Sequence, residues 1–573
     1  MVYILGIAGA GFGEPNAKST VGHDPAAALI KDGKIICAVE EERLIRQKHA
    51  TGHFPYKSIK FCLDYAGIDI EEVDYITSYI NFELFRKNSL RRIDFSEGIK
   101  NWALWEKVYK RKYLNLVKRI AVHCKKDEAA GERILKKLRF VNHHDAHAAS
   151  SFFTSGFEEA AILTIDGSGE GVCTTFSQGR GNSIKKLKEF YLPHTFGGFY
   201  SMFTEYLGFK PNNDEYKVMG LAPYGKPGID MADLINVDEE KGEYTIESKC
   251  FGKFYRYSSW LEKRFGPARK PGEEMTQHHK DLAYALQDLL QQSVLKLVKY
   301  LMRKTGSRKL CIAGGVGMNT KLSGFLQRQD FIDDLFVNPS PGDNGTSFGS
   351  ALWLYYQLTG SNGKRYLFDD PYLGPEYSDD EIEIALKQAK AKYKKIDDPS
   401  MEAAKLVAQG KIIGWFQGRL EWGARALGAR SIIADPRDPN MKDKVNAAIK
   451  FREAFRPFCP SMLYEAKEDY FEHPYDSPFM TLTFICKEEK RSEIPSVVHV
   501  DGTVRPQLVK KESNEKYYRM IEEFSKISSV PLVMNTSFNV RGEPVVCTPR
   551  DALRTFFCCG LDCLIIGDFL VSK

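Results

Sequence analysis

The stretch AAILTIDGSGEGVCTTFS, residues 160–177, contains the pattern that decides the fold. AAILTI and VCTTFS are short apolar runs of the length and composition typical of buried β-strands. A glycine-rich turn, Asp166-Gly167-Ser168-Gly169, separates them. This arrangement predicts a strand–turn–strand unit whose turn presents a carboxylate at the end of a strand.

The same plan is found at the N-terminus. An apolar run from Val2 to Ile7 precedes a glycine-rich segment, and two further apolar runs flank Asp32-Gly33. Asp-Gly between apolar runs is a strong signal for a β-hairpin. Two units of this kind predict a duplicated α/β domain with a polar cleft between its halves.

The length of the chain requires more than one domain. It has 573 residues, whereas a single hydrophobic core stops growing near ~250–300 residues. Residues 359–380, TGSNGKRYLFDDPYLGPEYSDD, are rich in Gly, Asp, Ser and Pro, which is typical of a linker. The expected domains are therefore residues 1–358 and 381–573.

Composition excludes several classes of protein. Hydrophobic residues make up 43% and charged residues 27%, as in ordinary globular proteins. No apolar run reaches the ~18 residues of a membrane-spanning helix, and the N-terminus lacks the basic region of a signal peptide. The 12 cysteines form no CxxC pair, and the net charge of +6 is small. We expect a cytoplasmic protein with no nucleic-acid or membrane partner.

The segment VNHHDAHAAS carries a candidate metal site. His143 and His147 stand four residues apart and would share one face of a helix, whereas His144 would point about 100° away. Asp166 and Asp343, each in a glycine-rich turn, are plausible further ligands. Two imidazoles and two carboxylates suit iron, manganese or zinc, and the spacing does not choose among them. The alternative is that the histidines only pack or cap a helix.

Glycine-rich loops suggest a nucleotide in the cleft. Neither GxGxxG nor GxxxxGK[ST] occurs in the chain. GGVGMN, residues 314–319, follows an apolar run, and PGDNGTSFG, residues 341–349, contains Asp343. Both would place backbone amides where a phosphate or an adenosine could approach, and tight turns are the alternative.

The C-terminal third is rich in cations placed among glycines, prolines and aromatics. Such guanidinium groups suit bidentate recognition of phosphate or carboxylate, and salt bridges to local acids are the alternative. The amide and hydroxyl groups of Asn535-Thr536-Ser537 are interpreted as further ligand contacts. The cations are Arg419, Arg425, Arg430, Lys450, Arg452, Arg456, Arg505 and Arg541.

Two helical regions complete the pattern. An apolar stripe over residues 281–304 predicts a long helix that ends at Gly306. Residues 82–137 are basic and aromatic with helical spacing, which favours a solvated amphipathic helix pair; a lid or partner surface is the alternative.

Ten motifs in order make the chain similar to a known family. It resembles the O-carbamoyltransferases of the NodU/CmcH type, which include tobramycin, cephamycin, ansamycin and nodulation-factor enzymes. In that family an actin/sugar-kinase-like domain, similar to the threonylcarbamoyl-transferase core, precedes a smaller YrdC-like α/β domain. The motifs are GHDPAAAL, EEER, HHDAHAAS, DGSGEG, YKVMGLAPYG, AGGVGMN, PGDNGTSFG, GARALGARSIIADPR, FREAFRPFCPSML and NTSFNVRGEPVVCTP.

The resemblance implies a two-step reaction. The YrdC-like domain would use carbamoyl phosphate and ATP to form carbamoyladenylate. The first domain would transfer the carbamoyl group to a hydroxyl of a small natural product (an antibiotic, a toxin alkaloid or a sugar derivative) and release AMP. Mg²⁺ with ATP and a homodimeric state are further possibilities.

The resemblance also assigns residues. The metal ligands would be His143, His147, Asp166 and Asp343, with Fe(II) the usual ion and another divalent metal as the alternative. Lys48, Gly315 and Asn319 would bind carbamoyladenylate, and His23 would be the general base for the acceptor hydroxyl. Carbamoyl phosphate and ATP would bind Arg425, Lys450, Arg456, Arg505, Asn535 and Ser537.

Some residues depart from the family pattern. Ala424 stands where proline is common, Gly317 stands where alanine is usual, and the loop of residues 11–22 before His23 is long. That loop leaves the identity of the acceptor open. The runner-up interpretation is a threonylcarbamoyl-type tRNA-modification relative, for which residues 82–137 would be the only basic surface. The second-domain motifs favour carbamoyl transfer to a small molecule.

Overall fold

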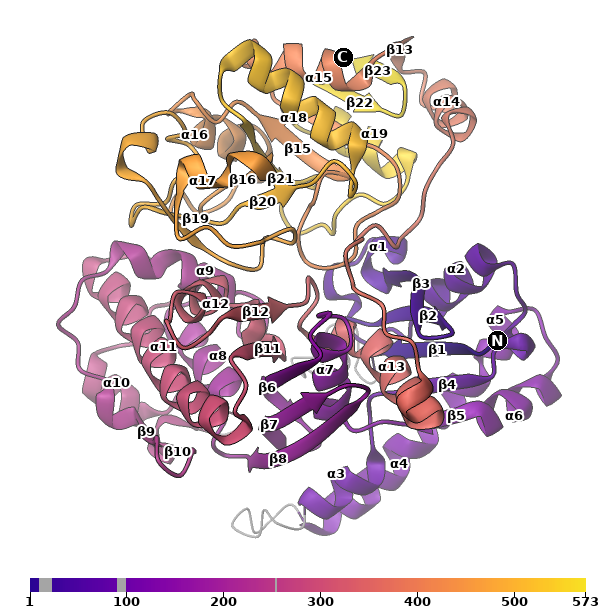
Figure 1. Cartoon of the computed structure of the whole chain (residues 1–573), viewed down its shortest axis with the longest axis vertical. Helices are drawn as coiled ribbons and strands as arrows, with labels where there is room; N and C mark the ends of the chain where they lie inside the picture. The colour runs from indigo at the N-terminus through magenta and orange to yellow at the C-terminus, as the bar shows by residue number, and fades with distance from the viewer. Residues whose placement is uncertain (10–22, 90–98, 253–254) are drawn as a thin grey trace. The chain divides into compact units, whose positions relative to one another are not determined.

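The computed structural model describes residues 1–9, 23–89, 99–252 and 255–573 (Figure 1). By its contacts the chain forms two compact units. The first contains Met1–Glu41 and His49–Phe368, and the second contains Glu42–Lys48 and Asp369–Lys573. The division after Phe368 falls within the expected linker. Because Glu42–Lys48 belongs to the second unit, that unit consists of two separate segments of the chain, which the predicted division at one linker does not include.

The first half of the first unit is a five-stranded sheet in the order β3-β2-β1-β4-β5. The β1–β2 and β2–β3 pairs are antiparallel, with Lys31 opposite Lys34 across the predicted Asp32-Gly33 turn. The β1–β4 and β4–β5 pairs are parallel. The strands are β1 (Tyr3–Ala8), β2 (Ala26–Lys31), β3 (Lys34–Glu40), β4 (Tyr75–Ser78) and β5 (Leu138–Phe140).

The second half repeats this topology. Its sheet has the order β12-β11-β6-β7-β8, in which β6 takes the place of β1. The β6–β7 and β7–β8 pairs are antiparallel, and the β6–β11 and β11–β12 pairs are parallel. The identical order and directions confirm the predicted duplication and the actin/sugar-kinase-like fold. The strands are β6 (Glu159–Gly169), β7 (Val172–Arg180), β8 (Ser183–Tyr191), β11 (Lys309–Ala313) and β12 (Asp334–Val337).

Two buried helices pack between the halves. All ten residues of α7 (His143–Phe152) are buried, so the histidines of this helix are held away from bulk water. Helix α13 (Thr346–Thr359) packs against both α7 and β1. The approach is close enough that a Cβ on Gly349 would lie 2.1 Å from the Ala146 carbonyl oxygen. This close packing fixes α7 within the first unit.

The predicted long helix is confirmed as α11 (Gln277–Thr305), and it ends where Gly306 adopts φ 70°. It begins one turn earlier than the apolar stripe because Thr276 and His279 form a capping box. Among the described residues, no helix is long and apolar enough to cross a membrane.

The second unit is a mixed α/β structure. An eight-stranded sheet has the order β13-β23-β22-β14-β15-β21-β16-β20, and a separate sheet has the order β17-β18-β19. The strands of the large sheet are β13 (Lys392–Lys395), β14 (Ile413–Phe416), β15 (Arg430–Ala434), β16 (Cys459–Leu463), β20 (Gln507–Val509), β21 (Leu532–Ser537), β22 (Cys563–Ile566) and β23 (Phe569–Ser572). The small sheet consists of β17 (Phe471–Glu472), β18 (Phe484–Cys486) and β19 (Thr503–Val504).

The segment Glu42–Lys48 is attached to the second unit through backbone carbonyls. Arg43 Nη2 donates to the Gly423 carbonyl oxygen at 3.0 Å, and Arg46 Nη2 donates to that of Pro544 at 2.8 Å. Both acceptors lie in loops of the second unit.

The expected linker is ordered at both ends. Arg365 donates to the Phe152 carbonyl oxygen at 2.8 Å, which ties it to the end of α7. Tyr372 donates its hydroxyl proton to the Leu427 carbonyl oxygen at 2.7 Å in the second unit. Each end of the stretch therefore belongs to the unit that it borders.

Candidate active site

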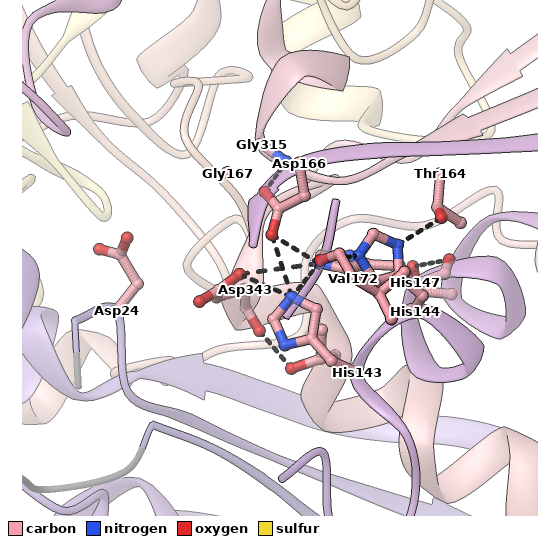
Figure 2. A network of polar contacts seen from close by, with 12 residues as sticks. Asp24, His143, His144, His147, Thr164, Asp166, Gly167, Val172, Gly315 and Asp343 are labelled. Atoms are coloured by element: carbon pink, nitrogen blue, oxygen red, sulfur yellow. Dashed lines mark hydrogen bonds and ion pairs between the residues drawn. The ribbon is translucent and has the colours of Figure 1, made fainter. Parts of the chain in front are cut away.

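Four predicted ligands converge in the first unit (Figure 2). His143 and His147 lie one turn apart on α7, Asp166 lies where β6 loses its regular pairing, and Asp343 begins the 3-10 turn η8 (Asp343–Gly345). One ligand atom from each of the four residues lies within 4.8 Å of all the others. The structure thus brings together residues that are 200 positions apart in the sequence, as the interpretation of the motifs requires.

The distances fit a metal ion. From His143 Nε2, the distances are 3.0 Å to His147 Nε2, 3.1 Å to Asp166 Oδ2 and 3.6 Å to Asp343 Oδ1. From His147 Nε2 they are 3.9 Å to Asp166 Oδ2 and 3.6 Å to Asp343 Oδ1. Ligand atoms ~2.1 Å from one ion would be separated by roughly 3.0–3.4 Å in octahedral or tetrahedral geometry. The cage is therefore close to metal-binding size.

The charges of the four ligands shift one another's pKa values. Burial opposes a charge on His143, but Asp343 and Asp166 outweigh it and raise the pKa of His143 to about 9. Burial likewise opposes the charge of Asp166, yet the histidines hold the pKa of this carboxyl well below its usual range. Positive charge on the imidazoles offsets the two carboxylates, and a bound divalent cation would supply the same compensation.

The third histidine of the motif is structural. Nδ1 of His144 lies 2.6 Å from Thr164 Oγ1, and Nε2 lies 3.0 Å from the Val172 carbonyl oxygen. Burial and the neighbouring histidines lower the pKa of His144 well below its usual value. A neutral ring that bridges β6 and β7 has no nitrogen left for a metal, which confirms that it points away from the other two.

The Asp166 turn is shaped to receive His143. A Cβ on Gly169 would lie 2.1 Å from Cγ of His143, so only glycine leaves room for the ring. On the other side, Asp166 Oδ1 accepts the backbone N–H of Gly315 at 2.7 Å. The Asp166 turn therefore contacts both helix α7, which carries His143, and the loop that follows β11.

The residues predicted to bind carbamoyladenylate are divided between the two units. Gly315 contacts Asp166 directly. Asn319 is buried beside Gln287, with which it exchanges two hydrogen bonds, and its side chain caps α12 (Thr320–Gln327). Lys48 belongs to the second unit, where its charge reaches Lys450.

The predicted base, His23, lies at the edge of the metal cage. Its Nε2 is 3.9 Å from Asp343 Oδ2, and its Nδ1 is 2.9 Å from Asp24 Oδ2. Asp24 Oδ1 in turn lies 2.8 Å from Nδ1 of His49. Burial lowers the pKa of His23, but Asp24, Asp343 and Asp166 outweigh it and raise that pKa to about 10. A cation bound by Asp343 and Asp166 would offset both carboxylates and so lower the pKa of His23. The long loop before His23 lies outside the described residues.

Asp24 and His49 lie beside the candidate base but are not predicted from the sequence. Asp24 follows His23 in the motif GHDPAAAL, whereas its pairing with His49 across 25 positions has no local signal. The one sequence signal for Asp24 is its place directly after His23, the predicted base.

Lys450 is the centre of the second candidate site. It ends a π-helical turn (Asn446–Lys450), a geometry often found at functional sites. Its ammonium group donates to the Asn539 side-chain oxygen at 2.8 Å and to the Asn539 carbonyl oxygen at 3.0 Å. Burial and the charges of Arg452, Arg456 and Lys48 lower the pKa of Lys450 well below its usual value. A buried lysine with like charges nearby is an environment that an anion would stabilise.

The other predicted phosphate ligands gather around β21. Asn535 donates to the Ala426 carbonyl oxygen at 3.0 Å, beside half-buried Arg425. Its strand partner Cys459 receives the guanidinium of Arg505, with Nη2 2.9 Å from the sulfur. Lys450 Nζ lies 3.3 Å from Ser537 Oγ.

Arg456 and two further arginines have local partners. Arg456 forms an ion pair with Glu453 at 3.6 Å. Arg430 is fully buried, donates to the Gln417 carbonyl oxygen at 2.8 Å and lies over the Phe416 ring. Arg419 donates to the Leu373 carbonyl oxygen at 2.6 Å. Both Arg430 and Arg419 thus donate to backbone carbonyls of the second unit.

These features define a two-unit α/β protein with a candidate metal cage in one unit and a cluster of cations around Lys450 in the other. The chain belongs to the carbamoyltransferase family: residues 17–352 match the family description "Carbamoyltransferase N-terminus" and residues 404–573 match "Carbamoyltransferase C-terminus". The protein is accordingly a carbamoyltransferase, and the resemblance inferred from the ten motifs is confirmed.

Individual relatives agree. "Uncharacterized protein sll1178" of Synechocystis is 38% identical, covering 100% of this chain and 97% of the relative. "Nodulation protein NolNO" of Sinorhizobium fredii is 38% identical over 97% of this chain and 80% of the relative. "Nodulation protein NolO" of Bradyrhizobium diazoefficiens is 38% identical over 76% of this chain and 79% of the relative.

Proposed function

We propose that the protein is an ATP-dependent O-carbamoyltransferase that uses carbamoyl phosphate and modifies a hydroxyl group of a small molecule. Carbamoyladenylate would form in the second unit and react in the first. The observation that carries the proposal is that two chemically different ligand sets belong to different units of one chain: a cage of imidazoles and carboxylates in the first, and a cluster of cations around buried Lys450 in the second.

The cationic cluster supports the first step. Water would hydrolyse carbamoyl phosphate to carbamate and phosphate. A carbamate oxygen would then attack the α-phosphorus of ATP, and the bond from that phosphorus to pyrophosphate would break. Both cosubstrates are polyanions, and Lys450, Arg456 and Arg505 offer the charge-assisted donors that they require. Adenylation supports catalysis because AMP leaves the carbonyl carbon of carbamoyladenylate more readily than hydroxide would leave that of carbamate.

The metal cage supports the second step. The acceptor oxygen would attack the carbonyl carbon of carbamoyladenylate, the bond from that carbon to the phosphate oxygen would break, and AMP would leave. His23 would take the hydroxyl proton on Nε2, with Asp24 accepting from Nδ1 and so fixing the tautomer.

His143, His147, Asp166 and Asp343 would hold a divalent metal, with Fe(II) as the proposed ion. When bound, the metal would supply Lewis-acid stabilisation of a phosphate or carbonyl oxygen. Two carboxylates and two imidazoles without a thiolate are a donor set suited to Fe(II), Mn(II) or Zn(II).

A coupled assay tests the proposed function. Purified protein should release AMP only when ATP, carbamoyl phosphate and a hydroxyl acceptor from a panel of alcohols are all present, and should not require tRNA. The carbamoylated acceptor should be detected by mass spectrometry. Product formation that depends on tRNA would favour the tRNA-modification alternative.

A further inference from the structure

Glu170 is a buried acid beside the metal cage that is not one of its four ligands. Its Oε2 accepts the backbone N–H of His143 at 3.1 Å, and its Oε1 accepts the backbone N–H of Asn81. Its own carbonyl oxygen accepts a hydrogen bond from Asn88 Nδ2 at 2.9 Å. One residue therefore contacts the first residue of the ligand helix and two residues of the segment that follows β4.

The backbone of Glu170 is held in an unfavourable conformation. Its φ is +54°, in the left-handed region that residues with a side chain seldom occupy. Such conformations persist where the surroundings over-determine them, and they concentrate at functional sites. The neighbouring Gly169 leaves the space that the His143 ring fills. The Asp166 turn thus contacts His143 twice, at the ring and at the backbone.

The carboxylate replaces an ordinary helix cap. The residue before α7, Asn142, makes no side-chain capping bond and instead donates to Asp145 Oδ2 at 2.7 Å. The first N–H groups of a helix need acceptors, and a carboxylate at that end is favourable. Glu170 provides this acceptor from the turn that also carries Asp166, so it sets where the first turn of α7 lies relative to that ligand.

We propose that Glu170 is a positioning residue that holds His143 at metal-binding distance from Asp166. The inference rests on the proposed metal site. Removing the Glu170 carboxylate would not remove any of the four metal ligands. It would, however, allow the first turn of α7, which carries His143, to shift relative to Asp166. Supporting residues of this kind typically change metal affinity about 10–100-fold when they are mutated.

The test is a titration of the metal-stripped protein with Co(II), followed by visible absorbance and elemental analysis. Glu170→Gln keeps the side-chain length, but only one of its two terminal atoms can accept an N–H. We expect the wild type to bind one Co(II) per chain and the variant to bind it about 10–100-fold more weakly. Asp127→Asn is the matched control, because Asp127 caps α6 (Glu128–Lys137) of the same unit at 2.8 Å.

The outcomes are separable. Equal Co(II) affinity in Glu170→Gln and the wild type would overturn the positioning role, and so would equal weakening in Asp127→Asn, because any lost cap would then suffice. A wild type that binds no Co(II) would instead contradict the metal site itself. If Glu170→Gln does not fold by circular dichroism, Glu170→Asp, which keeps the charge but shortens the reach, carries the same expectation.

Discussion

Nε2 of His143 lies 3.0 Å from Nε2 of His147. Two imidazole nitrogens face each other at this distance when one of them carries a proton or when both bind the same cation. Both side chains are buried, at 5% and 0% exposure, so water does not separate them. Because Asp343 and Asp166 favour a proton on His143, that proton would compete with a metal ion for the ring.

Metal affinity should depend on pH. Asp343 and Asp166 raise the pKa of His143 from 6.5 to about 9, so a metal ion would compete with a proton for this ring. Affinity for Co(II) should rise about 10-fold per pH unit between pH 6.5 and 9 and then level off. The proton released on binding can be measured by calorimetry in buffers of different ionisation enthalpy.

The same pKa predicts a stability difference. A histidine whose pKa is raised by folding stabilises the protein below its unfolded value of 6.5, and this contribution is lost as the pH rises through about 9. The metal-free protein should therefore lose stability over this range more than the Co(II)-loaded protein. Parallel thermal melts of the two forms at pH 6.5 and pH 9 check this, and identical slopes would contradict it.

Gly169→Ala should disrupt the cage. The added Cβ would lie 2.1 Å from the His143 ring, which must then move. We expect about 10–100-fold weaker Co(II) binding. Gly167→Ala in the same turn is the control, because a Cβ there meets nothing within 4 Å. A similar loss in both variants would argue against the ring contact.

Arg456→Ala should separate the two steps. Loss of one charge-assisted phosphate contact costs on the order of 1.5–3 kcal/mol, so carbamoyladenylate formation should fall about 10–100-fold. Transfer from supplied carbamoyladenylate should be unaffected. Lys444→Ala serves as a control, because Lys444 pairs with Asp438 on the surface. If supplied carbamoyladenylate also failed to react, the assignment of Arg456 to the first step would be wrong.

His23→Asn should stall the second step. Removing a general base typically costs about 10²–10⁴-fold, so carbamoyladenylate should accumulate while AMP release slows. Quenched-flow sampling with mass spectrometry measures both species. Normal turnover in the variant would assign His23 to packing.

The duplicated fold could be predicted from the sequence because its signals are local. The Asp32-Gly33 turn, the Asp166 turn and the stripe before Gly306 each depend on a few neighbouring residues. The His143/His147 spacing is also local, since one helical turn brings them together. The role of Asp166 as a candidate ligand could be predicted because glycine-rich turns at strand ends meet at one edge of a sheet.

Other features had no local signal. Arg46 and Pro544 are 498 positions apart, and only the folded chain shows that Glu42–Lys48 belongs to the second unit. The role of Glu170 depends on its hydrogen bond with the backbone N–H of His143. Because every residue except proline has such an N–H, the sequence does not indicate this partner. The sequence favours Arg430 as a ligand-binding cation because it lies among glycines. A buried guanidinium that donates to backbone carbonyls has the same glycine-rich sequence around it, so the two cases cannot be told apart from sequence.

The most direct test of the two-site account is a mass-spectrometric assay of metal-stripped protein supplied with Mg²⁺, ATP, carbamoyl phosphate and a productive hydroxyl acceptor. We expect carbamoyladenylate to accumulate without carbamoylated acceptor, and transfer to resume when Fe(II) is restored anaerobically. Unchanged transfer by the stripped protein, or loss of carbamoyladenylate itself, would contradict the account.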